Sequence, residues 1–158
     1  MGSARFVVTS SLAGMLAGCS PYQVGQWELT TLTTNETKVT VQSAEGILRV
    51  DKDFYADMTL NWSLLPHREE EPVSHHLKGE GVAIERFGDI SIDLAGDYAK
   101  GRNDGFTATV EMDCARRRPK GLKCHAAVTA VGLADTGMWS DPVDPLSQFA
   151  LDLTFEPK

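Results

Sequence analysis

Apolar and polar residues alternate along most of the chain after residue 24, which is the period of a half-buried β-strand. The clearest run has apolar side chains at every second position, namely Phe54, Ala56, Met58, Leu60, Trp62 and Leu64. Successive side chains of a strand point to opposite faces, so each such run has one inward face. The same alternation predicts strands over 90–94, 106–112, 122–128 and 149–155, and less regular ones over 25–34, 38–43 and 77–87.

Residues typical of turns separate these runs at 34–35, 44–46, 87–89 and 101–105. The pattern therefore predicts an all-β domain of about eight antiparallel strands with short connections, and no convincing helical period. Such a meander favours an up-and-down barrel, with a two-sheet β-sandwich as the alternative. The expected inward residues are bulky enough to fill an eight-stranded interior; the largest are Met58, Trp62, Phe106, Met112, Phe149 and Phe155.

The N-terminal segment has the pattern of a secretory signal. Arg5 and the amino terminus supply positive charge, and 6–18 contains no charged residue. This stretch is shorter than the roughly 20 residues that a helix needs to cross a bilayer. Its last residues, Leu16-Ala17-Gly18-Cys19, resemble the lipobox of bacterial lipoprotein precursors. The alternative is that 6–16 is the first strand or helix of a cytosolic domain.

The resemblance to lipoproteins implies a location and a domain organisation. Residues 1–18 would be removed as a signal peptide, and Cys19 would carry diacylglycerol and an acylated amino terminus. Ser20 stands where lipoproteins carry their sorting residue, and a residue other than aspartate there implies attachment to the outer membrane, on its periplasmic face. Residues 19–24 would form the lipid anchor and a short tether, and 25–158 a single β-barrel or β-sandwich domain. Several acyl chains hold a protein on a membrane durably, because each buried CH₂ contributes about 0.8 kcal/mol.

Of the three cysteines, lipidation uses Cys19 and leaves Cys114 and Cys124 as a pair. The inward positions of 106–112 lead into Cys114, and Cys124 leads into inward positions 126–130. Because an exported protein meets oxidising conditions and both cysteines share the inward parity, we expect a disulfide across a hairpin. Metal binding by the two thiolates with His125 is the competing role, but the close cysteine spacing of zinc sites is absent.

Charge narrows the classes of partner. The formal net charge is −7, and removal of residues 1–18 takes away Arg5 and makes it −8. An acidic domain repels phosphate backbones and anionic lipid surfaces, so we expect no nucleic-acid partner.

Motifs for catalysis and cofactor binding are missing from the sequence: there is no Gly-x-Ser-x-Gly, no His-Glu-x-x-His, no phosphate loop and no dinucleotide fingerprint. Histidines and consecutive glutamates meet in 66–76, where two prolines stiffen the segment. We interpret it as a solvated loop without a metal, because nothing there arranges a ligand set. The chain is therefore expected to be neither an enzyme nor a cofactor protein.

Two segments are candidates for partner contact. Arg116, Arg117 and Arg118 form a basic cluster suited to phosphate or carboxylate partners, or alternatively a device that keeps a hairpin tip soluble. Met138 and Trp139 lie in the proline-containing segment 132–146, either as an anchor for a protein partner or as a lid over a barrel end.

Two functions follow from these features. The first is an outer-membrane lipoprotein that binds another envelope protein as an accessory or structural subunit. The second rests on Gly25-Gln26-Trp27, which resembles the Gly-x-Trp that opens the first strand of lipocalin-like barrels. That resemblance implies an apolar cavity that carries a lipid or another small ligand, whereas simple core packing of Trp27 is the competing explanation.

Overall fold

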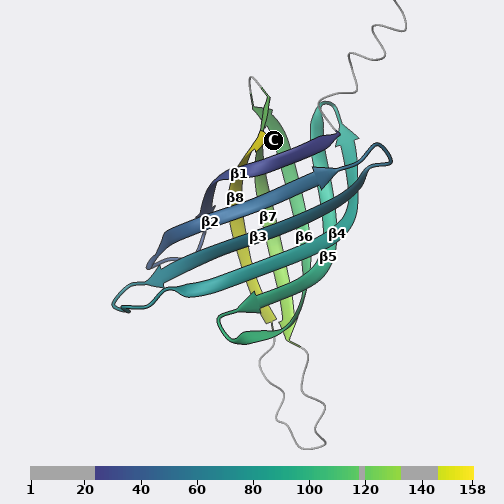
Figure 1. Cartoon of the computed structure of the whole chain (residues 1–158). Coiled ribbons are helices and arrows are strands. Elements are labelled where there is room, and N and C mark those ends of the chain that lie inside the picture. The colour runs from purple at the N-terminus through teal and green to yellow at the C-terminus, as the bar shows by residue number, and fades with distance from the viewer. Residues whose placement is uncertain (1–23, 118–119, 133–145) are drawn as a thin grey trace, which may run out of the picture.

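Eight antiparallel strands close into one barrel in a computed structural model of the chain, which describes residues 24–117, 120–132 and 146–158 (Figure 1). Each strand pairs with the next and β8 returns to β1, so the predicted up-and-down barrel is confirmed over the β-sandwich. The strands are β1 (Gly25–Thr34), β2 (Val39–Val50), β3 (Tyr55–Pro66), β4 (Val73–Arg86), β5 (Asp89–Lys100), β6 (Asn103–Arg117), β7 (Gly121–Gly132) and β8 (Leu146–Pro157).

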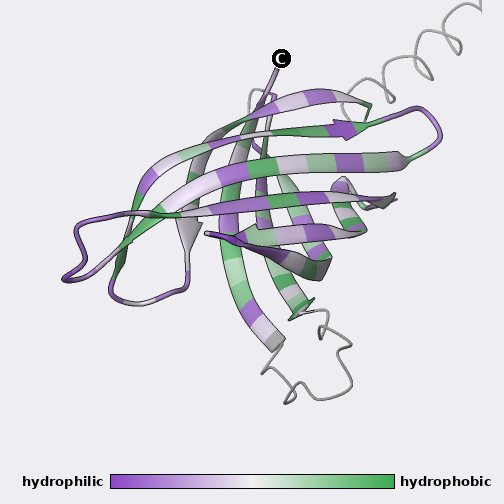
Figure 2. Cartoon of the chain, turned by 60° about the horizontal axis from the view of Figure 1, so that its bottom comes forward, coloured by the Kyte–Doolittle hydropathy of each residue, from purple (hydrophilic) through white to green (hydrophobic). Residues whose placement is uncertain are grey.

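The alternating pattern sorts side chains between the interior and the outer wall, and Figure 2 shows hydrophobic and hydrophilic positions alternating along the strands. On β3 the inward residues from Ala56 to Leu64 are at most 3% exposed. Phe106 is half-buried and packs against the same core. The other predicted interior residues are buried in one continuous cluster, namely Met58, Trp62, Met112, Phe149 and Phe155. Bulky side chains therefore occupy the interior, as the size of an eight-stranded barrel allows.

The predicted turn at 44–46 and the predicted inward position of Phe54 are both wrong. Residues 44–46 lie inside β2 and pair with 60–62 of β3. A Cβ at Gly46 would come within 2.9 Å of the backbone carbonyl oxygen of Thr59 and would also displace the end of the Leu60 side chain, so this glycine marks a close contact between strands and not a turn. Phe54 precedes β3, has a positive φ of 59° and is 37% exposed, so it does not point inward as predicted. The preceding turn sets its conformation, because the Asp51 carboxylate accepts hydrogen bonds from backbone N–H groups at 53 and 55.

The expected loop over 66–76 is also shorter than predicted. Strand β4 begins at Val73, and its partner β3 imposes the alternation on both histidines that follow. His75 lies opposite Trp62 and is buried, whereas His76 lies opposite Asn61 and is exposed. Burial against an aromatic partner thus outweighs the local preference of a polar, proline-flanked segment for a loop.

Strands β4 and β5 approach each other closely at inward glycines. Gly79 lies opposite Gly96, and Gly81 lies opposite Leu94. A Cβ at Gly96 would collide with the carbonyl oxygen of Lys78, and one at Gly81 with that of Asp93. Only glycine permits this approach of two backbones.

The two ends of the barrel carry different segments (Figure 1). We call one the Gly25 end: it holds the start of β1, the C-terminus and the turns at 51–54 and 87–88, together with the ends of β6 and β7 that flank 118–120. The opposite Gly132 end holds the turns at 35–38, 67–72 and 101–102 and the connection from β7 to β8.

Candidate functional site

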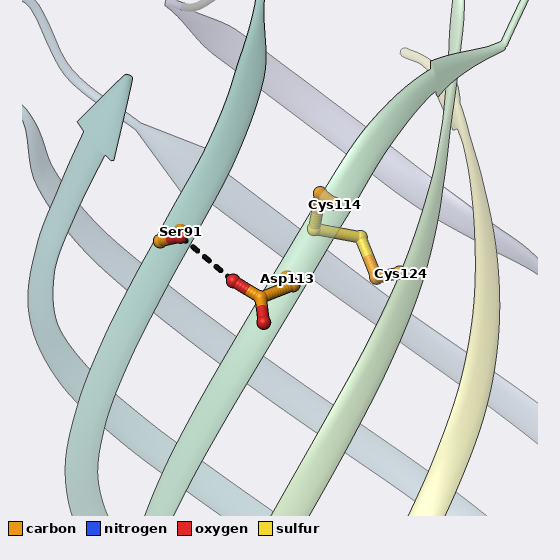
Figure 3. Close-up of a disulfide and its surroundings, with 4 residues drawn as sticks. All are labelled: Ser91, Asp113, Cys114 and Cys124. Carbon is orange, nitrogen blue, oxygen red and sulfur yellow. Dashed lines mark hydrogen bonds between the residues drawn. A yellow bond between two sulfur atoms is a disulfide. The ribbon is translucent and has the colours of Figure 1, made fainter. Parts of the chain in front are cut away.

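The predicted cysteine pair joins neighbouring strands (Figure 3). Cys114 of β6 lies opposite Cys124 of β7, their Cα atoms are 4.0 Å apart, and the two Sγ atoms are 2.01 Å apart. Each cysteine is 1% exposed and belongs to the core cluster. Shared inward parity on two paired strands brings the two thiols together, as expected from the sequence. The cysteines therefore form a buried structural link and leave no thiolate pair for a metal.

Polar side chains cross the outer wall beside this disulfide. Ser91 Oγ donates a hydrogen bond to Asp113 Oδ1 at 2.7 Å (Figure 3). On the next two strands, His125 Nδ1 lies 2.8 Å from Asp152 Oδ1. The serine is bonded to a carboxylate and not to the imidazole, so this row lacks the nucleophile–base contact that acyl transfer requires. Among the described residues, no group of three or more His, Cys, Asp or Glu side chains is placed to hold a metal ion.

The candidate partner contacts do not form one site. Arg116 and Arg117 end β6 at the Gly25 end. The guanidinium of Arg116 lies 3.4 Å from Glu85 Oε1 of β4, where both side chains are partly exposed, and Arg117 is exposed. Arg118, Met138, Trp139 and the predicted lipidation residue Cys19 lie outside the described residues. The segment with Met138 and Trp139 joins the barrel at the Gly132 end, opposite the arginines.

An aromatic and polar cluster occupies the interior near the Gly132 end. His75 is 4% exposed, Tyr98 is 2% exposed, and His75 Nδ1 lies 2.7 Å from Tyr98 Oη. The imidazole stacks on the Trp62 ring with centroids 5.0 Å apart and planes 12° apart. Phe149 and Phe106 pack around Tyr98 with ring centroids 5.4 and 5.8 Å from it. This cluster, which we call the Trp62 cluster, lies in the interior at this end.

Burial decides the protonation of the Trp62 cluster. Burial, together with the positive charge of Lys100, lowers the pKa of His75 from 6.5 to about 4. Burial also raises the pKa of Tyr98, so the phenol keeps its proton. The imidazole is therefore neutral at pH 7 and shares a hydrogen bond with a neutral phenol. Trp62 Nε1 is a buried donor for which residues 24–117, 120–132 and 146–158 offer no hydrogen-bond acceptor.

The sequence contains one pattern that indicates a member of this cluster, but the expected loop over 66–76 covers part of it. His75, Leu77 and Gly79 continue an inward period of two, and all three are buried. A strand beginning at Val73 would have placed His75 inside the barrel. Its contact with Tyr98 depends on the pairing of β4 with β5, which the alternation alone does not specify.

No protein family, curated protein or solved structure compared with the chain matches it. Within the part of the chain that the structure describes, no helix is long and apolar enough to cross a membrane. The function is therefore proposed from the chemistry of the chain and from the segments at the two barrel ends.

Proposed function

We propose that the protein is a lipoprotein of the bacterial outer membrane, held on the periplasmic face through acyl chains on Cys19. Its barrel binds another envelope protein as an accessory or structural subunit. One observation carries the proposal: the chain enters β1 at the Gly25 end, whereas the segment with Trp139 connects β7 to β8 at the Gly132 end. An anchor at Cys19 holds the Gly25 end toward the membrane and leaves the Gly132 end for a protein partner.

Three further features support a binding role outside the cytosol. The cysteine pair is oxidised in the core, as exported proteins allow. Bulky side chains occupy the interior, so contact with a protein partner uses the outer surface. Trp139 brings a large apolar area with few rotatable bonds, which suits the centre of a protein interface.

The anchor is tested by the intact mass of protein extracted from membranes and by incorporation of labelled palmitate. We expect loss of residues 1–18, an added mass of acyl chains and label in the polypeptide. The Cys19→Ala variant should show neither the acyl mass nor the label. An intact parent chain that keeps its initiating methionine and takes up no label would contradict the anchor.

The partner is tested by affinity purification after detergent solubilisation. We expect one stoichiometric envelope protein with the parent chain, a loss of most of it with Trp139→Ala, and retention with Trp139→Phe. Glu111→Ala is the matched control, because Glu111 is exposed on the outer wall of β6 away from both ends. Arg117→Ala tests the arginine cluster separately. A parent chain that purifies without any stoichiometric partner would contradict the role of a subunit.

A lipocalin-like carrier is the second candidate, and Trp62 supports it. The buried Nε1 donor has no acceptor among the residues that the structure describes, and an oxygen atom of a small ligand would supply one. Trp27 does not add support, because it is 4% exposed within the core cluster, as simple packing predicts. We expect solvent extraction of purified parent protein to release a small apolar molecule that Trp62→Phe, which keeps a ring without the donor, no longer retains. An empty extract would exclude the carrier.

A further inference from the structure

We propose that the Gly25 end is a lipid-contacting surface that lies against the headgroup region of the membrane. The surface consists of five apolar side chains, which we call the apolar rim: Phe54, Tyr55, Val82, Ile84 and Phe87. This inference rests on the proposed anchor at Cys19, but it concerns a different part of the chain and is tested separately.

Exposed apolar side chains are distributed unevenly between the two ends. Among the described residues, six large hydrophobic side chains are exposed, and five of them form the apolar rim. The sixth, Val131, lies at the Gly132 end. Tyr55 and Val82 lie opposite each other on the outer wall of β3 and β4, and Phe87 occupies the turn that ends β4. Scattered exposed apolar residues are normal, whereas a contiguous group at one end indicates a binding surface.

Phe87 is the strongest evidence that this surface meets something outside the chain. Arg86 pairs with Asp89, so Phe87 and Gly88 are the two central residues of a hairpin turn. Both have positive φ, 53° and 93°, which such turns normally achieve with Asn-Gly or Asp-Gly. A bulky side chain is strained in this conformation. The Phe87 side chain is also fully exposed, at 108%, so burial within the barrel does not offset the strain.

The proposed anchor and the length of chain that follows it favour a membrane as the surface that meets the apolar rim. Gly25 follows Cys19 by six residues, which span at most about 20 Å when fully extended. An acyl anchor at Cys19 therefore keeps the apolar rim close to the headgroups, where aromatic side chains are favoured. Exposed basic residues on the same end are Lys52, Arg86, Arg117 and Lys120, and exposed acidic residues there are Asp51, Asp53, Asp89 and Glu156. These four acids balance the four basic residues, so the apolar contacts and not charge supply the affinity.

The test uses the full chain and places a fluorescent reporter at each end of the barrel. Phe87→Trp and the control Val131→Trp are extracted from membranes and reconstituted into vesicles of phosphatidylethanolamine and phosphatidylglycerol, with or without brominated acyl chains. Emission of the parent chain is subtracted. Because an interfacial side chain reaches about 5–10 Å into the headgroup and acyl boundary, we expect brominated lipid to lower the added emission of Phe87→Trp roughly twofold. The added emission of Val131→Trp should not change.

The outcomes separate this inference from the proposed function. If both variants are acylated and Phe87→Trp is quenched no more than Val131→Trp, the lipid-contacting surface is overturned. The proposed anchor at Cys19 is then unaffected. If Phe87→Asn loses a protein that co-purifies with the parent chain, and Phe87→Trp is not quenched, the lipid-contacting surface is overturned. A protein partner is then favoured at the Gly25 end. If the mass shows no acyl chain, the anchor fails. In that case the full-length Cys19→Ala chain is tested for binding to the vesicles. Binding that is lost when Phe87→Asn is added would still support the lipid-contacting surface, and absence of binding would overturn it.

Discussion

Acid should destabilise the barrel through His75, and the size of the effect follows from its burial. The pKa of His75 is about 4 in the folded barrel and about 6.5 in the unfolded chain. Above pH 6.5 the imidazole is neutral in both states, so His75 makes no pH-dependent contribution to unfolding. Between pH 6.5 and pH 4 the unfolded chain binds a proton that the folded chain does not bind, and stability falls. Below pH 4 both states are protonated and the loss stops at about 3 kcal/mol.

The measurement is the free energy of unfolding in urea at several pH values between 7 and 4. Carboxylates also titrate in this range, so the informative quantity is the difference between the parent chain and a variant without the imidazole. We expect the stability of the parent relative to His75→Gln, which can still hydrogen-bond with Tyr98, to fall by about 2–3 kcal/mol from pH 7 to pH 4. His75→Phe, which keeps a ring against Trp62, should give the same dependence. A difference that stays constant with pH would refute the buried, neutral imidazole.

Three further predictions concern the stability of the barrel, measured by urea unfolding at pH 7. Replacing both Cys114 and Cys124 by alanine should cost about 3 kcal/mol, because the disulfide closes a loop with a sequence separation of 10; a reductant should destabilise the parent but not the variant. Phe87→Asn should raise stability by roughly 0.5–1 kcal/mol through relief of the strained turn, and a loss would contradict the assignment of strain. Gly81→Ala should cost about 1–3 kcal/mol, because the added Cβ meets the backbone of β5. Gly105→Ala is its control, since a Cβ there meets nothing within 4 Å, and equal effects at the two glycines would argue against a close approach of β4 and β5.

Sequence-based expectations for inward and outward positions agree with the structure along most of the regular alternation. Phe54 is an exception, because it lies in the turn before β3. The inward face of β3 from Ala56 to Leu64 and the shared parity of Cys114 and Cys124 could both be predicted, because side-chain direction in a strand repeats every two residues. Prediction was wrong where residues of an expected turn or loop lie inside strands. Gly46 and His75 are such cases, since in each the packing against a neighbouring strand outweighs the local preference.

The amino-acid sequence by itself determined the fold class, the period of the strands, the inward parity of the disulfide and the resemblance of residues 16–19 to a lipobox. Only the tertiary structure decided which strands pair, that the sheet closes, and which residues gather at each end. Alternation is a local property of an extended backbone, whereas register and closure depend on contacts between residues far apart in the chain. For that reason the Trp62 cluster and the apolar rim, whose members come from several strands or turns, could not be assembled from the pattern alone.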